Sequence, residues 1–454
     1  MEPWLAAHLP VLDLALDAVR AVQRASARAD RRTSGPVPSG AARPDPVHLD
    51  PVHLDPARVA AAFASDQVFA LDGRPMEAFA PLSGFFRTSD GWVRTHANYP
   101  HHRARLTTLV GLPDDVGRPA LAQRLTQLAG QELEDRAADP ATGPERGGGA
   151  IVARVRTEQE WRTSAPGRAA SSGPLVRTAQ RAEPTGARRR RVAEPLPSGG
   201  AAPLAGVRVL DLTRVIAGPV ATRTLALLGA DVLRVDPPVP AEIEWQHLDS
   251  GQGKRSTVLD LRDGGDRRTA QELLEAADVL VTGYRPGAIE GLGLEVPRGV
   301  VTGRVSAWGG TGPWAGRRGF DSIVQAASGI ALLEGQDGAP GALPAQALDH
   351  TSGYLLAAGI VDALTGADDG PDLDVSVSLA RTAAWLLDLP GRDPLHPAAA
   401  PVRRPEPVEG SARATVTHAG VTTARPALPG HDDYAHPAHR WGTDAPIWRP
   451  TPAR

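Results

Sequence analysis

Cysteine is absent from the 454 residues, which excludes thiol nucleophiles, cysteine-ligated zinc and disulfides. Lysine is nearly absent, because Lys254 is the only lysine among 49 basic residues. No run of about 18 uncharged apolar residues occurs, and this excludes an ordinary transmembrane helix. Acidic and basic residues almost balance at a formal net charge of -3, so no global field would gather nucleic acid or an acidic membrane. These absences favour a soluble, cytoplasmic protein.

Proline and glycine are plentiful instead, and their clusters divide the chain. Residues 181–203 combine both with an arginine run and lack apolar periodicity, which is typical of an interdomain linker. We expect residues 33–56, 181–203 and 395–454 to be largely unpacked, because they offer little apolar surface to offset the entropy of ordering. The expected divisions are a helical N-terminal segment with a flexible insertion (1–57), a small α+β domain (58–180), the linker (181–203), a large domain (204–390) and a Pro-rich C-terminal tail (391–454).

The second half alternates strand and helix patterns. GVRVLDL at 206–212 reads as a buried strand, a helix follows at 221–230, and a second strand at 231–236 completes a βαβ unit. The alternation continues to about residue 387, which predicts an α/β class domain: an open, mainly parallel, Rossmann-like sheet with helices on both faces. In the first half, aromatic and β-branched runs flank Asp90-Gly91, so residues 84–99 predict a β-hairpin in a smaller α+β domain.

Several short motifs have both a functional and a structural interpretation. The turn at 215–219 could face a phosphate with free backbone N–H groups, or could be a tight βα turn. SGQGKRS at 250–256 fails the P-loop pattern, because Arg255 stands where Ser or Thr is required. Asp349 precedes a helical stretch and has a structural explanation as an N-cap. The histidines at 96, 101 and 102 lack metal-ligand spacing, so no metal site is expected.

Five blocks between about residues 203 and 385 together resemble the family III CoA-transferases, also called the CaiB/BaiF family. The resemblance implies an open α/β domain that holds CoA, and transfer of CoA between carboxylic acids through anhydride and aspartyl-CoA intermediates. By alignment of ALDHTSG, it places the family's catalytic aspartate at Asp349. The blocks are PLAGVRVLDLTRVIAGPVATRTLALLGADVLRVD, GKRSTVLDL, ADVLVTGYRPGAIEGLGL, GRVSAWGGTGPWAGRRGFDSIVQAASGIALLEG and QALDHTSGYLLAAGIVDAL.

The same resemblance implies the substrates and the residues that hold them. Lys254 would bind a CoA phosphate through its ammonium charge, and Arg255 would bind one through two guanidinium N–H groups. The implied partners are an acyl-CoA and a carboxylic acid acceptor, so that CoA takes part as a substrate. No metal, redox cofactor, nucleic acid or membrane is implied. The implied CoA-binding residues are Val215, Ile216, Ala217, Lys254, Arg255, Tyr284 and Ala288.

Residues 84 to about 180 are similar to the family's small domain, which ordinarily follows the large one. DGWVRTHANYPHHRARLTTLVGL carries the likeness, followed by QELEDRAA and AIVARVRTEQEW. Here this piece comes first, so the chain resembles a rearranged member with the small domain at its N-terminal side. Ordinary members interlock as dimers, and the resemblance leaves a homodimer open for this chain.

Two alternatives stay open. A 2-methylacyl-CoA racemase of the same family needs a His and Asp pair, and Phe320 stands at the racemase His position, while Asp321 is expected to cap its own helix and point elsewhere. A non-catalytic CoA-binding or scaffold protein is the other alternative. It is motivated by Gly283, Pro237 and Gly291, which stand where the family usually has Asn, a basic residue and often Arg.

Overall fold

A seven-stranded sheet forms the centre of the computed structural model, which describes residues 3–33, 53–181, 202–284, 288–365, 372–396 and 411–450. The strand order is β6-β12-β11-β10-β7-β8-β9, and all neighbours run parallel except β6, which is antiparallel to β12. The strands are β6 (Arg177–Gln180), β7 (Arg208–Leu212), β8 (Asp231–Asp236), β9 (Arg255–Val258), β10 (Val279–Thr282), β11 (Val301–Ser306) and β12 (Leu373–Ser378). The expected α/β class and open, mainly parallel sheet are confirmed.

Helices cover both faces of this sheet because its strands are apolar on both sides. In β7, Val209 belongs to one buried cluster and Leu210 to another, as alternation along a strand requires. The first face carries α1 (Val11–Thr33), α2 (Pro56–Phe63), α9 (Ala217–Leu227), α15 (Ala347–Leu364) and α16 (Leu379–Asp388). The second carries α11 (Gly264–Glu275).

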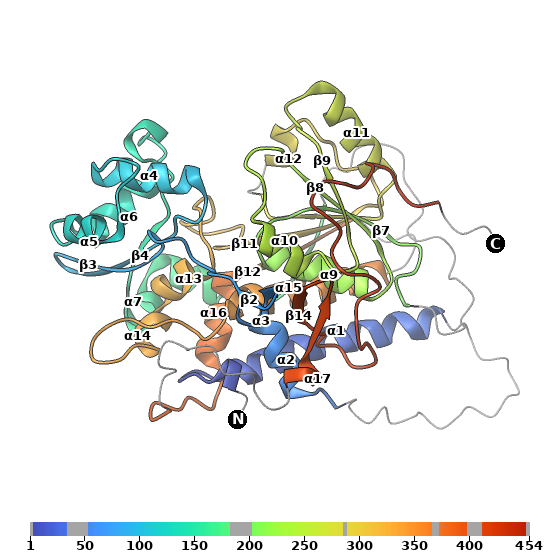
Figure 1. Ribbon diagram of the computed structural model, residues 1–454, viewed down its shortest axis with the longest axis horizontal. Helices are drawn as coiled ribbons and strands as arrows, with labels where there is room; N and C mark the ends of the chain where they lie inside the picture. Colours follow the sequence, from blue (N-terminus) through green and yellow to red (C-terminus); the bar gives the residue numbers. More distant parts are fainter. Residues whose placement is uncertain are drawn as a thin grey trace, which may run out of the picture.

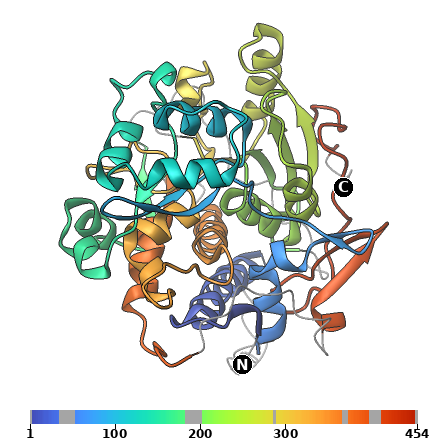
Figure 2. The same cartoon turned by 60° about the vertical axis from the view of Figure 1, so that its left-hand side comes forward.

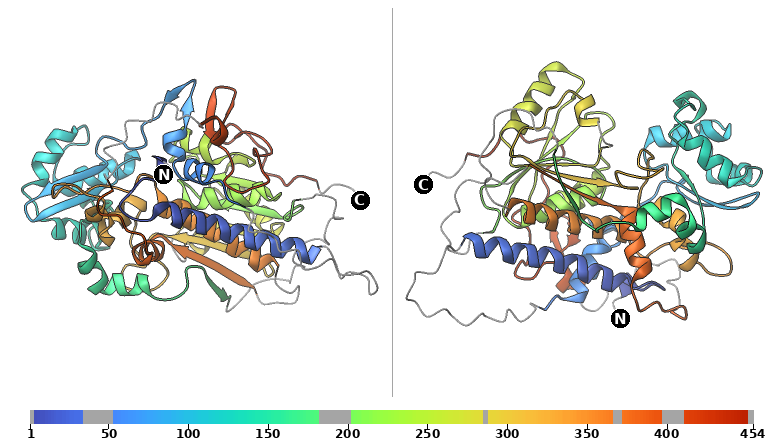
Figure 3. Two further views of the ribbon diagram at one scale, coloured as in Figure 1. Left: turned by 90° about the horizontal axis from the view of Figure 1, so that it is seen from below. Right: turned by 180° about the vertical axis from the view of Figure 1, so that it is seen from behind.

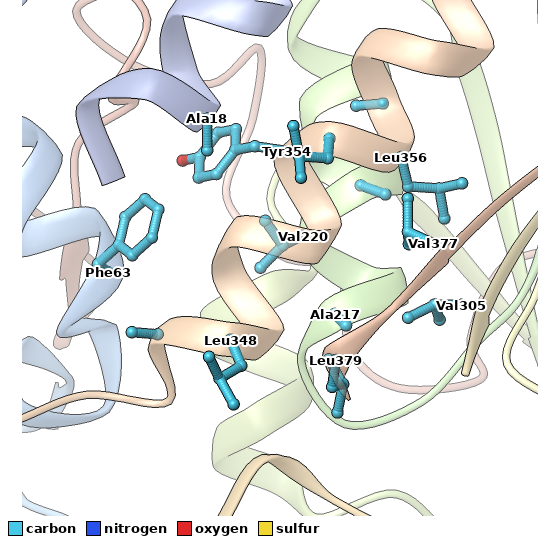
Figure 4. Close-up of a cluster of buried hydrophobic side chains, with 14 of the residues drawn as sticks. Ala18, Phe63, Ala217, Val220, Val305, Leu348, Tyr354, Leu356, Val377 and Leu379 are labelled. Atoms are coloured by element: carbon cyan, nitrogen blue, oxygen red, sulfur yellow. The ribbon is translucent and has the colours of Figure 1, made fainter. Parts of the chain in front are cut away.

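Helix α15 is the central element of the first face. Seventeen of its residues are buried, and it packs along α1, which runs beneath it in Figures 1 and 3. In Figure 4, Tyr354 of α15 faces Ala18 and Phe63, and its ring stacks on that of Phe63 at a centroid distance of 5.5 Å. Val220 of α9 lies on another side of the same helix (Figure 4). The start of α15 is therefore held by neighbours on several sides.

A separate lobe with its own core lies beside the sheet (Figure 1), and Figure 2 brings this lobe forward. Its antiparallel strands are β3 (Gly84–Thr88), β4 (Gly91–Thr95) and β5 (Val152–Arg154), and its helices are α4 (Pro100–Val110), α5 (Arg118–Leu125) and α6 (Gly130–Ala138). Thr88 pairs with Gly91, which confirms the hairpin expected at 84–99. Two more helices, α7 (Glu158–Thr163) and α8 (Ala165–Ser171), follow β5.

The segments at either end of this lobe join other parts of the molecule. After α2 and α3 (Ser65–Val68), the short strands β1 (Ala70–Leu71) and β2 (Arg74–Pro75) form a sheet with β13 (Thr415–His418) and β14 (Val421–Ala424). Strand β6 leaves the lobe and joins the large sheet. The lobe is therefore shorter than the expected 58–180 segment.

The expectation of an unpacked C-terminal tail is wrong for residues 411–450. Thr443 forms an antiparallel bridge with Thr257 of β9, and the Asp444 carboxylate accepts the Ser256 N–H at 2.7 Å. Trp448 Nε1 donates to the Leu273 carbonyl at 3.0 Å. The tail is ordered because it covers the unpaired edge of β9. Most of the other two segments expected to be unpacked, residues 34–52 and 182–201, lies outside the described residues.

Candidate active site

A cavity of about 410 Å³ opens at the carboxyl ends of β7, β10, β11 and β12. Strand order reverses there: β8 and β9 follow β7 on one side, and β10 returns to its other side. Open α/β sheets bind ligands at such switch points. Leu212, Gly283 and Ser306 come from the ends of three strands, while His102 and Tyr99 come from the lobe. The lobe thus supplies one wall of the cavity.

The turn after β7 reaches this cavity as expected from the sequence. Val215, Ile216 and Ala217 all line it. Val215 adopts a left-handed φ of +70°, which is uncommon for a β-branched residue, and its N–H donates to Glu242 Oε2 at 3.2 Å. A β-carbon on Gly218 would lie 2.3 Å from Thr213 Cβ, so glycine is required for this tight turn. The helix start at Ala217 consequently borders the space where a ligand would lie.

Asp349 contributes its carboxylate to the same cavity and is only 7% exposed. The N-cap of α15 is Gln346, so Asp349 lies in the first turn and the N-cap interpretation is wrong. Burial raises the pKa of Asp349 well above its usual value, and the negative charge of Asp321 raises it further. A buried carboxylate with this surrounding is weakly solvated and hence reactive once ionised.

Asp321 supports the backbone beneath Asp349. It is the first residue of α13 (Asp321–Ser328) and is 0% exposed. Its Oδ2 accepts the Asp349 N–H at 3.0 Å, and its Oδ1 accepts from Gln325 Nε2 at 2.5 Å. Asp321 therefore bonds the backbone at the start of α15 instead of capping its own helix, whose N-cap is Phe320, and this corrects the sequence-based expectation. Its own pKa is raised, chiefly by burial.

Two lobe histidines, His96 and His102, lie against Phe320, which their spacing in the sequence did not indicate. The His96 ring stacks on Phe320 at 4.0 Å, while His102 lies 5.7 Å from it and lines the cavity with His101. Burial lowers the pKa of His96 to about 3 and also lowers that of His102, so both rings are neutral at pH 7. No group of three potential metal ligands occurs within the described ranges.

Lys254 and Arg255 do not reach the cavity, which corrects their expected contacts with CoA phosphates. The Lys254 side chain is 1% exposed, and its Nζ lies 3.2 Å from Asp211 Oδ2 and 3.0 Å from Thr222 Oγ1. Burial lowers its pKa to about 8. Arg255 forms a bidentate ion pair with Asp231 at 3.0 Å beneath the C-terminal segment. Asp211 of β7 and Asp231 of β8 thus bind the two cations at the start of β9.

The two remaining residues expected at the site differ in outcome. Tyr284 lines the cavity just beyond β10. Ala288 begins α12 (Ala288–Gly291), and its side chain lies outside the described part of the chain. Of the residues expected to form the site, the structure therefore brings together Asp349, Val215, Ile216, Ala217 and Tyr284.

Residues 204–421 match the model of CoA-transferase family III. This match identifies residues 204–421, slightly less than half of the chain, as a region that resembles CoA-transferase family III. Asp349, the β7 turn and Tyr284 all fall inside the matched region. The resemblance stated from the sequence blocks is therefore confirmed at the level of the family, and the mainly parallel sheet is the part of the structure that carries it.

Named relatives of the family III region share about a third of their aligned residues with it. Acetyl-coenzyme A transferase nodX of Hypoxylon pulicicidum is 35% identical over 42% of this chain and 35% of its own length. The probable fatty acyl-CoA transferase Rv3272 of Mycobacterium tuberculosis is 31% identical over 48% of this chain and 60% of its own. The chain thus spans less than two thirds of these relatives.

A crystal structure of Rv3272 from Mycobacterium tuberculosis can be superposed on part of the chain. The match is 33% identical, covers 41% of this chain and 57% of that one, and has a TM-score of 0.38. In the described part of the present chain, no helix is both long and apolar enough to cross a lipid bilayer.

Proposed function

We propose that the chain is an acyl-CoA:carboxylate CoA-transferase in which Asp349 is the nucleophile. The observation that carries the proposal is the position of Asp349: a buried carboxylate at the strand ends, in the same cavity as the 215–217 turn. The names of the relatives support CoA transfer as the reaction class. No named relative fixes the acyl group or the acceptor acid for this chain.

The chemistry needs a carboxylate and proceeds in balanced steps. Ionised Asp349 attacks the thioester carbonyl of an acyl-CoA, giving a mixed anhydride and releasing CoA thiolate. The thiolate attacks the aspartyl carbonyl of the anhydride, giving aspartyl-CoA thioester and the free donor acid. The acceptor carboxylate attacks this thioester to give a second anhydride and thiolate. Attack of thiolate on the acceptor carbonyl forms the new acyl-CoA and regenerates Asp349.

We further propose where CoA binds relative to Asp349 and how the lobe takes part. CoA lies along the 215–217 turn and Tyr284, which line the cavity with Asp349. Thiolate is a good leaving group, so the proposal includes neither a metal nor a redox cofactor. It also includes a cytoplasmic location, and a rearranged domain order in which the N-terminal lobe acts as the small domain. The Tyr99 hydroxyl joins this lobe to the large sheet by donating to Glu242 Oε1 at 2.6 Å.

One observation favours a second candidate, α-proton exchange on a 2-methylacyl-CoA. His102 lines the cavity with Asp349 and its imidazole is neutral at pH 7, although the lowered pKa makes it a weak proton acceptor. The sequence places Phe320 at the racemase His position, but the structure puts imidazole rings directly against Phe320. Exchange would need His102 on one face of the α-carbon and Asp349 on the other.

A single incubation separates the two reactions. A chiral 2-methylacyl-CoA is mixed with an acceptor acid in deuterated water, and the thioesters are analysed by mass spectrometry. We expect the acceptor thioester to accumulate, with negligible deuterium at the α-carbon, because the proposed steps break no C–H bond. The wild-type protein without acceptor is the control. Deuterium incorporation that disappears in Asp349→Ala would favour the racemase instead.

Asp321→Asn should shift the pH dependence of CoA transfer. Asp349 must be ionised to attack, so the rate should rise with pH through the raised pKa of Asp349. The amide introduced by Asp321→Asn would keep an oxygen for the Asp349 N–H but remove the negative charge that raises this pKa. We expect the acidic limb of kcat/KM to move down by roughly one pH unit. The exposed Asp337→Asn variant is the control, and an unmoved limb would show that the two carboxyls are not coupled.

A further inference from the structure

Two arginines from different parts of the chain converge at the edge of the cavity. Arg105 lies on α4 of the lobe, and Arg318 lies in the segment between β11 and α13. A β-carbon on Gly149 would lie 2.9 Å from Arg105 Nη1 and 3.4 Å from Arg318 Nη1. The two guanidinium nitrogens are therefore within about 6 Å of each other. Two guanidinium groups at this distance can both donate hydrogen bonds to one anionic group that lies between them.

The location of these arginines links them to Asp349. Arg318 lines the cavity that contains Asp349 and also a neighbouring hollow of about 250 Å³, whereas Arg105 lines the hollow. Ile151 and Trp308 border both spaces. A molecule whose reacting end lies at Asp349 can therefore extend past Arg318 toward Arg105.

Cations outnumber carboxylates around this point, because Arg105, Arg317 and Arg318 line the hollow together with Glu134 and Asp139. His101 lines the cavity, and its pKa is lowered first by partial burial and then by the positive charges of Arg105, Arg318 and Arg214. Arg214 lies 3.6 Å from Glu242, a carboxylate that also accepts from Arg234 at 2.7 Å. Within the described ranges, no carboxylate lies in ion-pair distance of Arg105. Cations brought together in this way repel one another, and a bound anion relieves that repulsion.

We propose that Arg105 and Arg318, with His101, bind an anionic group of a substrate that reacts at Asp349. The identity of that substrate rests on the proposed CoA-transferase function. The group is a phosphate of CoA or a second carboxylate of the acceptor acid, since guanidinium forks bind both. This site takes the place of Lys254 and Arg255, which the structure pairs with Asp211 and Asp231.

The test uses the full chain and the variant Arg105→Gln. Arg87→Gln is the matched control, because Arg87 is an exposed arginine of the same lobe that stacks on Trp92 and lines neither space. Binding of inorganic pyrophosphate, CoA and pantetheine is measured by calorimetry at low and high salt. We expect Arg105→Gln to weaken pyrophosphate and CoA binding on the order of tenfold and to leave pantetheine unchanged. Arg87→Gln should match the wild type with all three.

The other outcomes identify the source of the anion or overturn the site. Unchanged CoA affinity, with a raised KM for a dicarboxylate acceptor but not for the matching monocarboxylate, would assign the site to the acceptor. Unchanged values for CoA, pyrophosphate and both acceptors would overturn the proposal. Pyrophosphate binding that depends on Arg105, without any transfer from an acyl-CoA panel, would keep the anion site and refute the transferase function.

Discussion

Asp349→Asn is expected to reduce CoA transfer by at least about a thousandfold while CoA affinity changes little. The amide has nearly the shape of the carboxylate but cannot form an anhydride with the acyl group. The substitution should not unfold the protein, because burial already disfavours the charged form of Asp349. Initial rates with a donor acyl-CoA and an acceptor acid measure the loss.

A matched control lies on the same helix. Asp362 of α15 is largely exposed and pairs with Arg28 at 2.7 Å, so Asp362→Asn should retain full activity. Intact-protein mass spectrometry after incubation with acyl-CoA and hydroxylamine should reveal a modified residue at position 349 in the wild type only. Transfer that persists in Asp349→Asn would remove this residue from the reaction and return attention to a CoA-binding role.

Asp211→Ala should destabilise the protein by about 3–5 kcal/mol, because it leaves a buried ammonium without its partner. The Asp211 carboxylate lies 3.2 Å from Lys254 Nζ and also accepts from Thr213 and Thr222. Lys254 can release its proton when Asp211 is lost, since burial already lowers its pKa to about 8, and this limits the cost. Urea denaturation at pH 7 measures the change in the free energy of unfolding.

The paired variant distinguishes a structural lysine from a CoA ligand. Asp211→Leu combined with Lys254→Met replaces the buried ion pair by apolar side chains and should recover most of the lost stability. CoA affinity of the double variant should equal that of the wild type, because Lys254 lies outside the cavity. A large loss of CoA affinity with stability intact would instead restore the phosphate contact suggested by the sequence.

Strong periodicity explains why the large sheet could be predicted. Val209 and Leu210 alternate between two buried faces of β7, and such runs occur only where helices cover both sides. The position of Asp349 and of the turn at Val215 was also predictable, because both lie within distinctive sequence blocks.

The predictions that were wrong share one physical cause, which is contact between residues far apart in the sequence. Nothing local shows that Lys254 will meet Asp211, which is 43 residues away on a strand beyond β8, or that Asp321 will bond the backbone of Asp349. The packed tail escaped prediction because its partners are distant in the sequence: the edge strand β9, and the buried cluster that Ala427 and Leu428 join. Similarly, His102 reaches the cavity only through the placement of the lobe.

The pairing of Thr443 with Thr257 also constrains the timing of synthesis. On the ribosome, β9 emerges almost two hundred residues before the segment that covers it, which at 5–20 residues per second is a delay of roughly 10–40 s. The delay is longer for strand β1, because Thr422, the partner of Ala70, is made more than three hundred residues later. During this interval the nascent chain presents open strand edges that can pair with other chains. Newly made copies are therefore more open to pairing with other chains than the finished fold, in which these edges are covered.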